Sequence, residues 1–210
     1  MKGIFITLEG NEGCGKSTQI KLLAVYLRKK GRKVFVTREP GGTPIGEQVR
    51  NVVLSAKNKG MSPVCETLLY MASRAQLVQD VLLPRLTKGE TVLCDRWVDA
   101  TVAYQGYAGG VDAKWIHEVG KGATQGLKPK LSLYLDLPVA EGLKRSRRRG
   151  KPDRMELKKI SFHQKVRKGF LAVSRQEPGR FRRLALRPSE DIAQVHERIK
   201  KEVDRVLRRS

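Results

Sequence analysis

The sequence is poor in cysteine, aromatic and acidic residues, and it has no long apolar run. Cys14, Cys65 and Cys94 are scattered along 210 residues, so they fit neither a disulfide framework nor the ligand spacing of a zinc site. No apolar run approaches the ~18 residues that a membrane-spanning helix needs. The apolar run at residues 4–6 is too short for a signal peptide and leads directly into a glycine-rich loop. These absences favour a cytoplasmic protein with reduced cysteines and no membrane partner.

Acidic residues are outnumbered by basic ones, 21 against 43, and the formal net charge is +22. Such a balance favours the binding of polyanions, which are either nucleic acids or phosphorylated small molecules. Charge alone does not choose between these two classes. The densest basic segment covers residues 144–154, and by composition it is typical of a solvated helix end or a nucleic-acid-binding patch.

The order of apolar segments predicts the fold class. The chain contains no internal repeat and no linker rich in proline or serine, so we expect one domain over residues 1–210. Strands are expected at residues 4–8, 33–37, 91–94, 131–136 and 183–186. Helices are expected at residues 17–30, 44–54, 62–86, 112–121, 139–149 and 156–175. A final helix is expected to be capped by Ser189 and to turn Ile192 inward. This alternation predicts an α/β fold, with a parallel sheet of about five strands and helices on both faces.

Residues 10–17 match the pattern G-x-x-x-x-G-K-[ST] between a predicted strand and a predicted helix, which indicates a fold of the P-loop NTPase type. Backbone N–H groups and the helix N-terminus both favour phosphate there. Lys16 is expected to reach the β- and γ-phosphates, and the Ser17 hydroxyl is expected to ligate Mg²⁺. The expected nucleotide-binding residues are Gly10, Asn11, Glu12, Gly13, Cys14, Gly15, Lys16, Ser17 and Thr18. GTPases, motors, nucleic-acid ATPases and small-molecule kinases all share this loop.

Three further segments narrow the choice, namely TREPGGT at residues 37–43, YMASR at 70–74 and DRWVDATVAYQG at 95–106. Together with the phosphate loop, they resemble the thymidylate kinase family over nearly the whole chain. The first and third segments in combination are specific to that family. The resemblance implies transfer of the γ-phosphoryl group of ATP to dTMP in the presence of Mg²⁺, and it also implies a homodimer.

The resemblance assigns roles to individual residues. Arg96 would bind the dTMP phosphate, and Glu12 would contact the sugar 3′-hydroxyl and the metal shell. Tyr70, where the family usually has phenylalanine, would stack on thymine, and Arg74 would hydrogen-bond a thymine carbonyl. Tyr104 would crowd the 2′ position of the sugar. The implied substrate-binding residues are Arg38, Arg50, Tyr70, Arg74, Arg96, Thr101, Tyr104 and Gln105. The implied metal-site residues are Ser17, Glu12 and Asp95.

The resemblance also gives the basic segment a function, because some family members carry an arginine in the phosphate loop and others supply it from a lid. The relevant loop position here is the uncharged Gly13, so the sequence resembles the type with arginines in the lid. A mobile lid is expected around residues 144–156, with Arg149 as the first candidate to neutralise the transferring group, followed by Arg154 and Arg145. The expected catalytic residues are Lys16, Arg96, Arg149, Glu12 and Arg154.

Two other functions stay open. One is a kinase for another nucleoside monophosphate or for a deoxynucleoside, although Arg38, Arg50 and Arg96 favour a phosphorylated acceptor. The other is a nucleic-acid-binding P-loop ATPase, which the net charge of +22 suggests. No nucleic-acid-binding module is recognisable, so nucleic acid is not expected as a specific partner. The histidines at positions 117, 163 and 196 lie on predicted helices without clear partners and receive no role.

Overall fold

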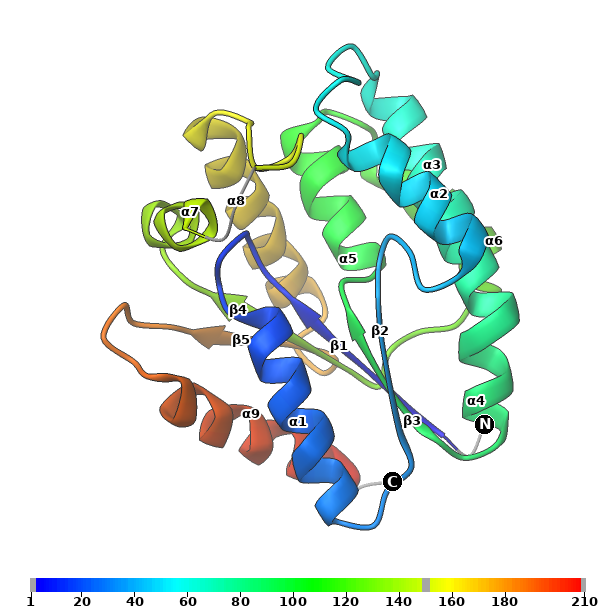
Figure 1. Cartoon of the computed structure of the whole chain (residues 1–210), viewed down its shortest axis with the longest axis vertical. Helices are drawn as coiled ribbons and strands as arrows, with labels where there is room; N and C mark the ends of the chain where they lie inside the picture. Colours follow the sequence, from blue (N-terminus) through cyan, green and yellow to red (C-terminus); the bar gives the residue numbers. More distant parts are fainter. Residues whose placement is uncertain (1–2, 149–151, 209–210) are drawn as a thin grey trace.

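The computed structural model describes residues 3–148 and 152–208 and shows a parallel sheet between two layers of helices (Figure 1). The sheet has five strands in the order β2-β3-β1-β4-β5, and all neighbouring pairs are parallel. The strands are β1 (Ile4–Glu9), β2 (Val34–Arg38), β3 (Thr91–Asp95), β4 (Leu131–Asp136) and β5 (Phe181–Ala185). The predicted α/β fold and its five strands are confirmed.

The helices lie between consecutive strands, except for the last one, which follows β5, and they cover both faces of the sheet (Figure 1). They are α1 (Lys16–Lys29), α2 (Pro44–Leu54), α3 (Pro63–Leu77), α4 (Leu83–Thr87), α5 (Val98–Thr101), α6 (Ala113–Thr124), α7 (Val139–Arg147), α8 (Ile160–Gln176) and α9 (Ile192–Leu207). Two π-helical segments, η1 (Val78–Leu82) and η2 (Val102–Ala108), continue α3 and α5. No helix within the two described ranges is long and apolar enough to cross a membrane.

Strand β1 lies at the centre of the sheet, and alternate residues pack against different helices. Ile4, Ile6 and Leu8 join the core that α1 and α9 form on one face. Phe5 points to the other face, where its ring meets Trp97 edge-on with centroids 4.8 Å apart. All six residues of β1 are buried because helices cover both faces, as is typical of parallel sheets. The segment that follows β1 is therefore held by a rigid core.

The start of the last helix differs from the prediction. The N-cap of α9 is Asp191, whose side chain accepts a hydrogen bond from the backbone N–H of Gln194. In turn, the side-chain oxygen of Gln194 accepts a hydrogen bond from the backbone N–H of Asp191. Ser189 is therefore not the cap, because Asp191 and Gln194 complete a capping box two residues later. The predicted inward position of Ile192 is also wrong, since this side chain is 59% exposed. The buried stripe of α9 consists of Val195, Ile199 and Val203.

Candidate active site

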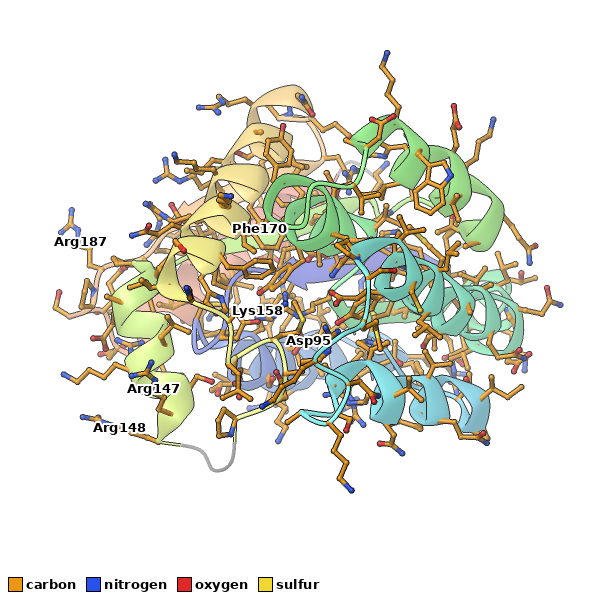
Figure 2. The ribbon with its side chains drawn as sticks, turned by 90° about the horizontal axis from the view of Figure 1, so that it is seen from above. Asp95, Arg147, Arg148, Lys158, Phe170 and Arg187 are labelled. Atoms are coloured by element: carbon orange, nitrogen blue, oxygen red, sulfur yellow. The ribbon has the colours of Figure 1, made fainter. Side chains whose placement is uncertain are left out.

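Segments that follow β1, β2 and β3 meet around one cavity of about 300 Å³. The lining residues that the sequence singled out are Glu12, Gly13, Lys16, Ser17, Arg38, Arg50, Tyr70, Arg74, Asp95, Arg96, Thr101, Tyr104 and Gln105. Every residue implied to bind the acceptor therefore lies around the same cavity as the phosphate loop. Figure 2 shows Asp95 near the centre of the molecule, whereas Arg147, Arg148 and Arg187 project outward.

The phosphate loop connects the buried end of β1 to the first turn of α1. Gly10, Gly13 and Gly15 all have positive φ angles, of 143°, 68° and 97°, which residues with a Cβ adopt only with strain. The Nζ atom of Lys16 donates to the carbonyl oxygens of Gly10 at 2.9 Å and Asn11 at 3.0 Å. The ammonium group therefore lies along the loop that is predicted to hold phosphates.

Two of the predicted metal-site residues are in direct contact. Ser17 lies in the first turn of α1, Asp95 ends β3, and the Ser17 hydroxyl donates to Oδ2 of Asp95 at 3.1 Å. Hydroxyl and carboxylate oxygens are ligands that suit Mg²⁺, which also keeps water and phosphate oxygens as ligands. Among residues 3–148 and 152–208, no cluster of three or more His, Cys, Asp and Glu side chains could hold a metal ion.

Glu12 is the third predicted metal-site residue, and it lies in a different cluster of polar side chains. Its Oε1 atom accepts from Tyr104 Oη at 2.6 Å and from Arg96 Nη2 at 3.0 Å. Arg96 also donates to the Tyr104 hydroxyl at 3.1 Å and to the Gly10 carbonyl at 3.1 Å. Burial raises the pKa of Glu12, but the neighbouring ring of His163 and the charges of Arg96 and Lys16 outweigh it and lower the pKa to about 2. Glu12 is therefore a carboxylate at neutral pH.

The backbone of Arg96 is in the left-handed region, with φ at 77°. A side chain in this region costs ~1–3 kcal/mol and persists where the surrounding structure fixes it. Here the N–H of Arg96 donates to the carbonyl of Leu8 at 3.0 Å. This hydrogen bond directly follows the pairing of β1 with β3, in which Leu8 lies opposite Asp95. The strained turn directs the guanidinium from the end of β3 toward the phosphate loop.

His163 is a polar member of the site that the sequence did not predict. It lies in the first turns of α8, its ring is fully buried, and its Nδ1 atom is 3.2 Å from Oε2 of Glu12. Asn11 donates from Nδ2 to the carbonyl oxygen of the same histidine at 3.0 Å. No local pattern signals this residue, because its partners lie about 150 positions earlier in the chain and only the fold brings them together.

Two buried glutamates, which the sequence analysis also did not predict as site residues, contact the side chains that are predicted to bind the thymine base. Glu39 pairs with Arg74 at 2.5 Å, and Arg74 also donates to the Thr101 hydroxyl at 3.2 Å. Burial raises the pKa of Glu39, and the charge of Arg74 lowers it by less. Glu66 accepts from Nε2 of Gln105 at 2.5 Å. These carboxylates fix the orientation of the side chains that are predicted to meet the base.

Comparison with known proteins shows the family of the chain. A family model described as thymidylate kinase matches residues 8–199. The chain belongs to the thymidylate kinase family. It is 50% identical to a thymidylate kinase of Deinococcus radiodurans over 192 residues, which cover 91% of this chain and 93% of the relative. It is 52% identical to a thymidylate kinase of Geotalea daltonii over 186 residues, which cover 85% and 87%. A crystal structure of a thymidylate kinase from Ehrlichia chaffeensis superimposes with a TM-score of 0.78 at 32% identity, covering 96% of this chain and 98% of that one.

Of the three arginines that were predicted for the lid, the structure describes two. Arg149 lies outside the described residues. Arg145 pairs with Glu141 one turn earlier at 2.7 Å and donates to the Pro188 carbonyl at 3.1 Å. Arg154 is buried, and neither Arg145 nor Arg154 lines the cavity in this conformation. A direct role for either arginine in phosphoryl transfer stays a prediction.

Proposed function

We propose that the protein transfers the γ-phosphoryl group of ATP to dTMP, forming ADP and dTDP. The observation that carries this proposal is the shared cavity, in which Lys16 and Ser17 of the phosphate loop face the same space as Tyr70 and Arg74. A donor at the loop and an acceptor beside α3 would thus meet without further rearrangement of the sheet. The thymidylate kinases of Deinococcus radiodurans and Geotalea daltonii support the same assignment by their similarity over most of the chain.

The donor side suits Mg-ATP. Backbone N–H groups of the loop and Lys16 would hold the phosphates, while the oxygen atoms of Ser17 and Asp95 fit a site for Mg²⁺. When bound, the ion would offset negative charge on the phosphate oxygens. Arg96 also lines the cavity and supplies a further cation, at the predicted position of the acceptor phosphate.

The acceptor side suits a thymine nucleotide. Arg74 is 1% exposed, and among the described residues the sulfur of Met71, at 3.0 Å, is the one hydrogen-bond acceptor of its Nη1 atom. Because a thioether is a weak acceptor, this N–H group is available for a stronger acceptor such as a thymine carbonyl. Tyr70, one turn earlier on α3, offers a ring for stacking.

The reaction needs no general base from the protein. The attacking atom would be an oxygen of the dTMP phosphate, which is already anionic at neutral pH. Catalysis can therefore come from positioning and from cations around the transferring group. Glu12, held beside Tyr104, would orient the sugar of the acceptor.

An assay of ADP release with Mg-ATP tests this proposal. The acceptors to compare are dTMP, dUMP, dCMP, dGMP, AMP and thymidine. We expect strong turnover with dTMP, and dUMP as the next best acceptor. Preference for thymidine or for another monophosphate would contradict the roles of Tyr70, Arg74 and Gln105. ATP hydrolysis that DNA stimulates, without dTMP turnover, would favour a nucleic-acid-dependent ATPase instead.

We also propose a homodimer that forms through α2 and α3, which pack side by side along one edge of the molecule (Figure 1). Ile45 and Val52 of α2 are 53% and 43% exposed, and Val64 and Leu68 of α3 are 48% and 46% exposed. Each pair lies on one face of its helix, so together they form an apolar surface of the kind that partners cover. Sedimentation should show a dimer for the wild type and a monomer for Leu68→Glu. A wild-type monomer at micromolar concentration would contradict this assembly.

We place the protein in the cytoplasm. Cys14, Cys65 and Cys94 are free thiols, as predicted, and Cys65 is exposed. A free exposed thiol suits a reducing compartment. Localisation of a tagged copy in cells would test this assignment.

A further inference from the structure

The two carboxylate oxygens of Glu12 have different surroundings. Oε1 accepts hydrogen bonds from Tyr104 and Arg96. Oε2 is buried 3.2 Å from Nδ1 of His163, and within the described residues neither of these two atoms has a hydrogen bond of regular geometry. A buried carboxylate oxygen without a donor is costly, and Nδ1 of His163, at 3.2 Å, is close enough to donate to it.

His163 is held firmly in that position. Its ring is 0% exposed and packs edge-on against Phe162, with centroids 5.7 Å apart. Its backbone carbonyl accepts from Nδ2 of Asn11, the residue that precedes Glu12. Helix α8 therefore contacts two successive residues of the phosphate loop, one through the backbone and one through the ring.

We propose that His163 is a positioning residue, which fixes the Glu12 carboxylate by donating a hydrogen bond from Nδ1 to Oε2. This inference rests on the proposed function, because Glu12 is the residue that is expected to meet the 3′-hydroxyl of dTMP. Arg96 and Tyr104 hold one oxygen, and His163 holds the other, so the plane of the carboxylate is set from two sides. The orientation of Glu12 would in turn decide how well the enzyme recognises the 3′-hydroxyl.

Substitutions at position 163 separate this hydrogen bond from simple packing. In His163→Asn the side-chain amide nitrogen lies as many bonds from Cα as Nδ1 does, so the donor is retained. His163→Leu has similar volume and no donor. Val166→Ala serves as a control, because Val166 is buried on the same helix and lines no part of the cavity.

The kinetic test compares dTMP with 3′-deoxy-dTMP, which lacks the hydroxyl group. Losing a hydrogen bond to a charged group corresponds to a ~10–100-fold change. We expect His163→Leu to lower kcat/KM for dTMP by about that factor and to change kcat/KM for the 3′-deoxy analogue much less. His163→Asn should retain most of the preference for dTMP, and Val166→Ala should keep the wild-type ratio even if it lowers Tm. Equal losses in the leucine and asparagine variants would overturn the proposal, as would an unchanged ratio in His163→Leu.

A second measurement does not depend on activity. Nitrogen-15 NMR of the ligand-free protein reports which ring nitrogen of His163 carries a proton, and His163→Asn identifies its signals. A proton on Nδ1, with a shift that changes in Glu12→Gln, supports the hydrogen bond. A ring protonated only at Nε2 overturns it. Failure of the wild type to phosphorylate dTMP would contradict the proposed function alone, since the NMR result would still decide the role of His163.

Discussion

The guanidinium of Arg154 and the carboxylate of Glu66 form a buried ion pair, with Nη2 2.6 Å from Oε2 and both side chains less than one-tenth exposed. Arg154 also donates from Nε to the Val53 carbonyl at 2.7 Å, and its backbone N–H donates to the Leu54 carbonyl at 3.0 Å. Since these are the last carbonyl groups of α2, Arg154 satisfies the end of one helix and the side chain of another. The side chains of its neighbours Asp153 and Met155 line the cavity, so successive side chains of this segment alternate between the cavity and the core.

Arg154→Ala should therefore reduce stability more than it reduces the chemical step. Removing one partner of a buried ion pair leaves an uncompensated charge and costs ~3–5 kcal/mol. Arg145→Ala breaks a partly exposed pair within one helix and should cost at most ~1 kcal/mol. Urea denaturation of the two variants tests the comparison. Unchanged stability of Arg154→Ala, together with a large loss of kcat, would instead support its role at the transferring group.

Gly13 cannot be replaced without moving the phosphate loop or α7. Its φ angle is 68°, and a Cβ built there would collide with the carbonyl oxygen of Gly142 in α7. Gly13→Ala should destabilise the protein by more than ~2 kcal/mol and weaken ATP binding, and Gly13→Arg should do so at least as strongly. Gly60→Ala is the control, because a Cβ at that position meets no atom within 4 Å. Calorimetric ATP titration of Gly13→Ala with wild-type affinity would contradict this expectation.

The sequence predicted those parts of the site that depend on local patterns. Lys16 and Ser17 belong to a continuous motif, while Arg38 and Asp95 end apolar strands whose carboxyl ends must meet in a parallel sheet. Their arrival at one cavity follows from topology. Such residues can be placed in space once the order of strands and helices is known.

The residues that the sequence missed have partners far along the chain. Glu66 and His163 carry no motif of their own, and Glu39 lies in the TREPGGT segment without a predicted role. Each of the three is defined by a contact with a distant side chain. The helix over residues 98–108 was also missed. Its segment η2 is packed closely against α8, where a Cβ at Gly169 would meet the Cα of Ala103 at 2.8 Å. Tertiary packing, rather than propensity, determines such elements.

Glu9 should make stability depend on pH. Both of its carboxylate oxygens are buried without hydrogen-bonding partners in the described part of the chain. Burial raises the pKa of Glu9 well above its usual range, and the carboxylate of Asp99 raises it further. The folded protein therefore binds this proton more tightly than the unfolded chain does.

The stability that comes from the bound proton is fully present below the ordinary glutamate pKa of ~4.3 and is lost as pH rises toward the raised value. Glu9→Gln cannot titrate, so its advantage over the wild type should grow across this range, by about 1.4 kcal/mol for each unit of pKa elevation. Urea denaturation of the ligand-free proteins at several pH values measures the difference. If the free energy of unfolding changed with pH in the same way for both proteins, burial would not raise the pKa of Glu9.

Lys16→Ala should greatly reduce turnover while leaving the fold intact. The ammonium group donates to the loop carbonyls of Gly10 and Asn11 and to the Cys14 sulfur at 3.7 Å, all within the loop that is predicted to hold the phosphates. Its loss removes a positive charge from the position where phosphate charge develops, so kcat should fall by ~10²–10³-fold or more. Circular dichroism and Tm should change little. A variant that keeps near-wild-type kcat would contradict the donor assignment of the loop.

Arg149→Ala tests whether the basic segment supplies the cation that Gly13 does not. A single arginine at the transferring group contributes ~10³-fold or more to kcat, whereas a surface charge contributes a general field that salt screens. Arg148→Ala is the matched control, because it removes the same charge from the adjacent exposed residue, which projects outward at the end of α7 (Figure 2). We expect a loss of about 10³-fold in kcat for Arg149→Ala that persists at high salt, and a small loss for Arg148→Ala that salt removes. Equal, salt-sensitive losses in both variants would mean that the segment acts through its total charge, and that no single arginine contacts the transferring phosphoryl group.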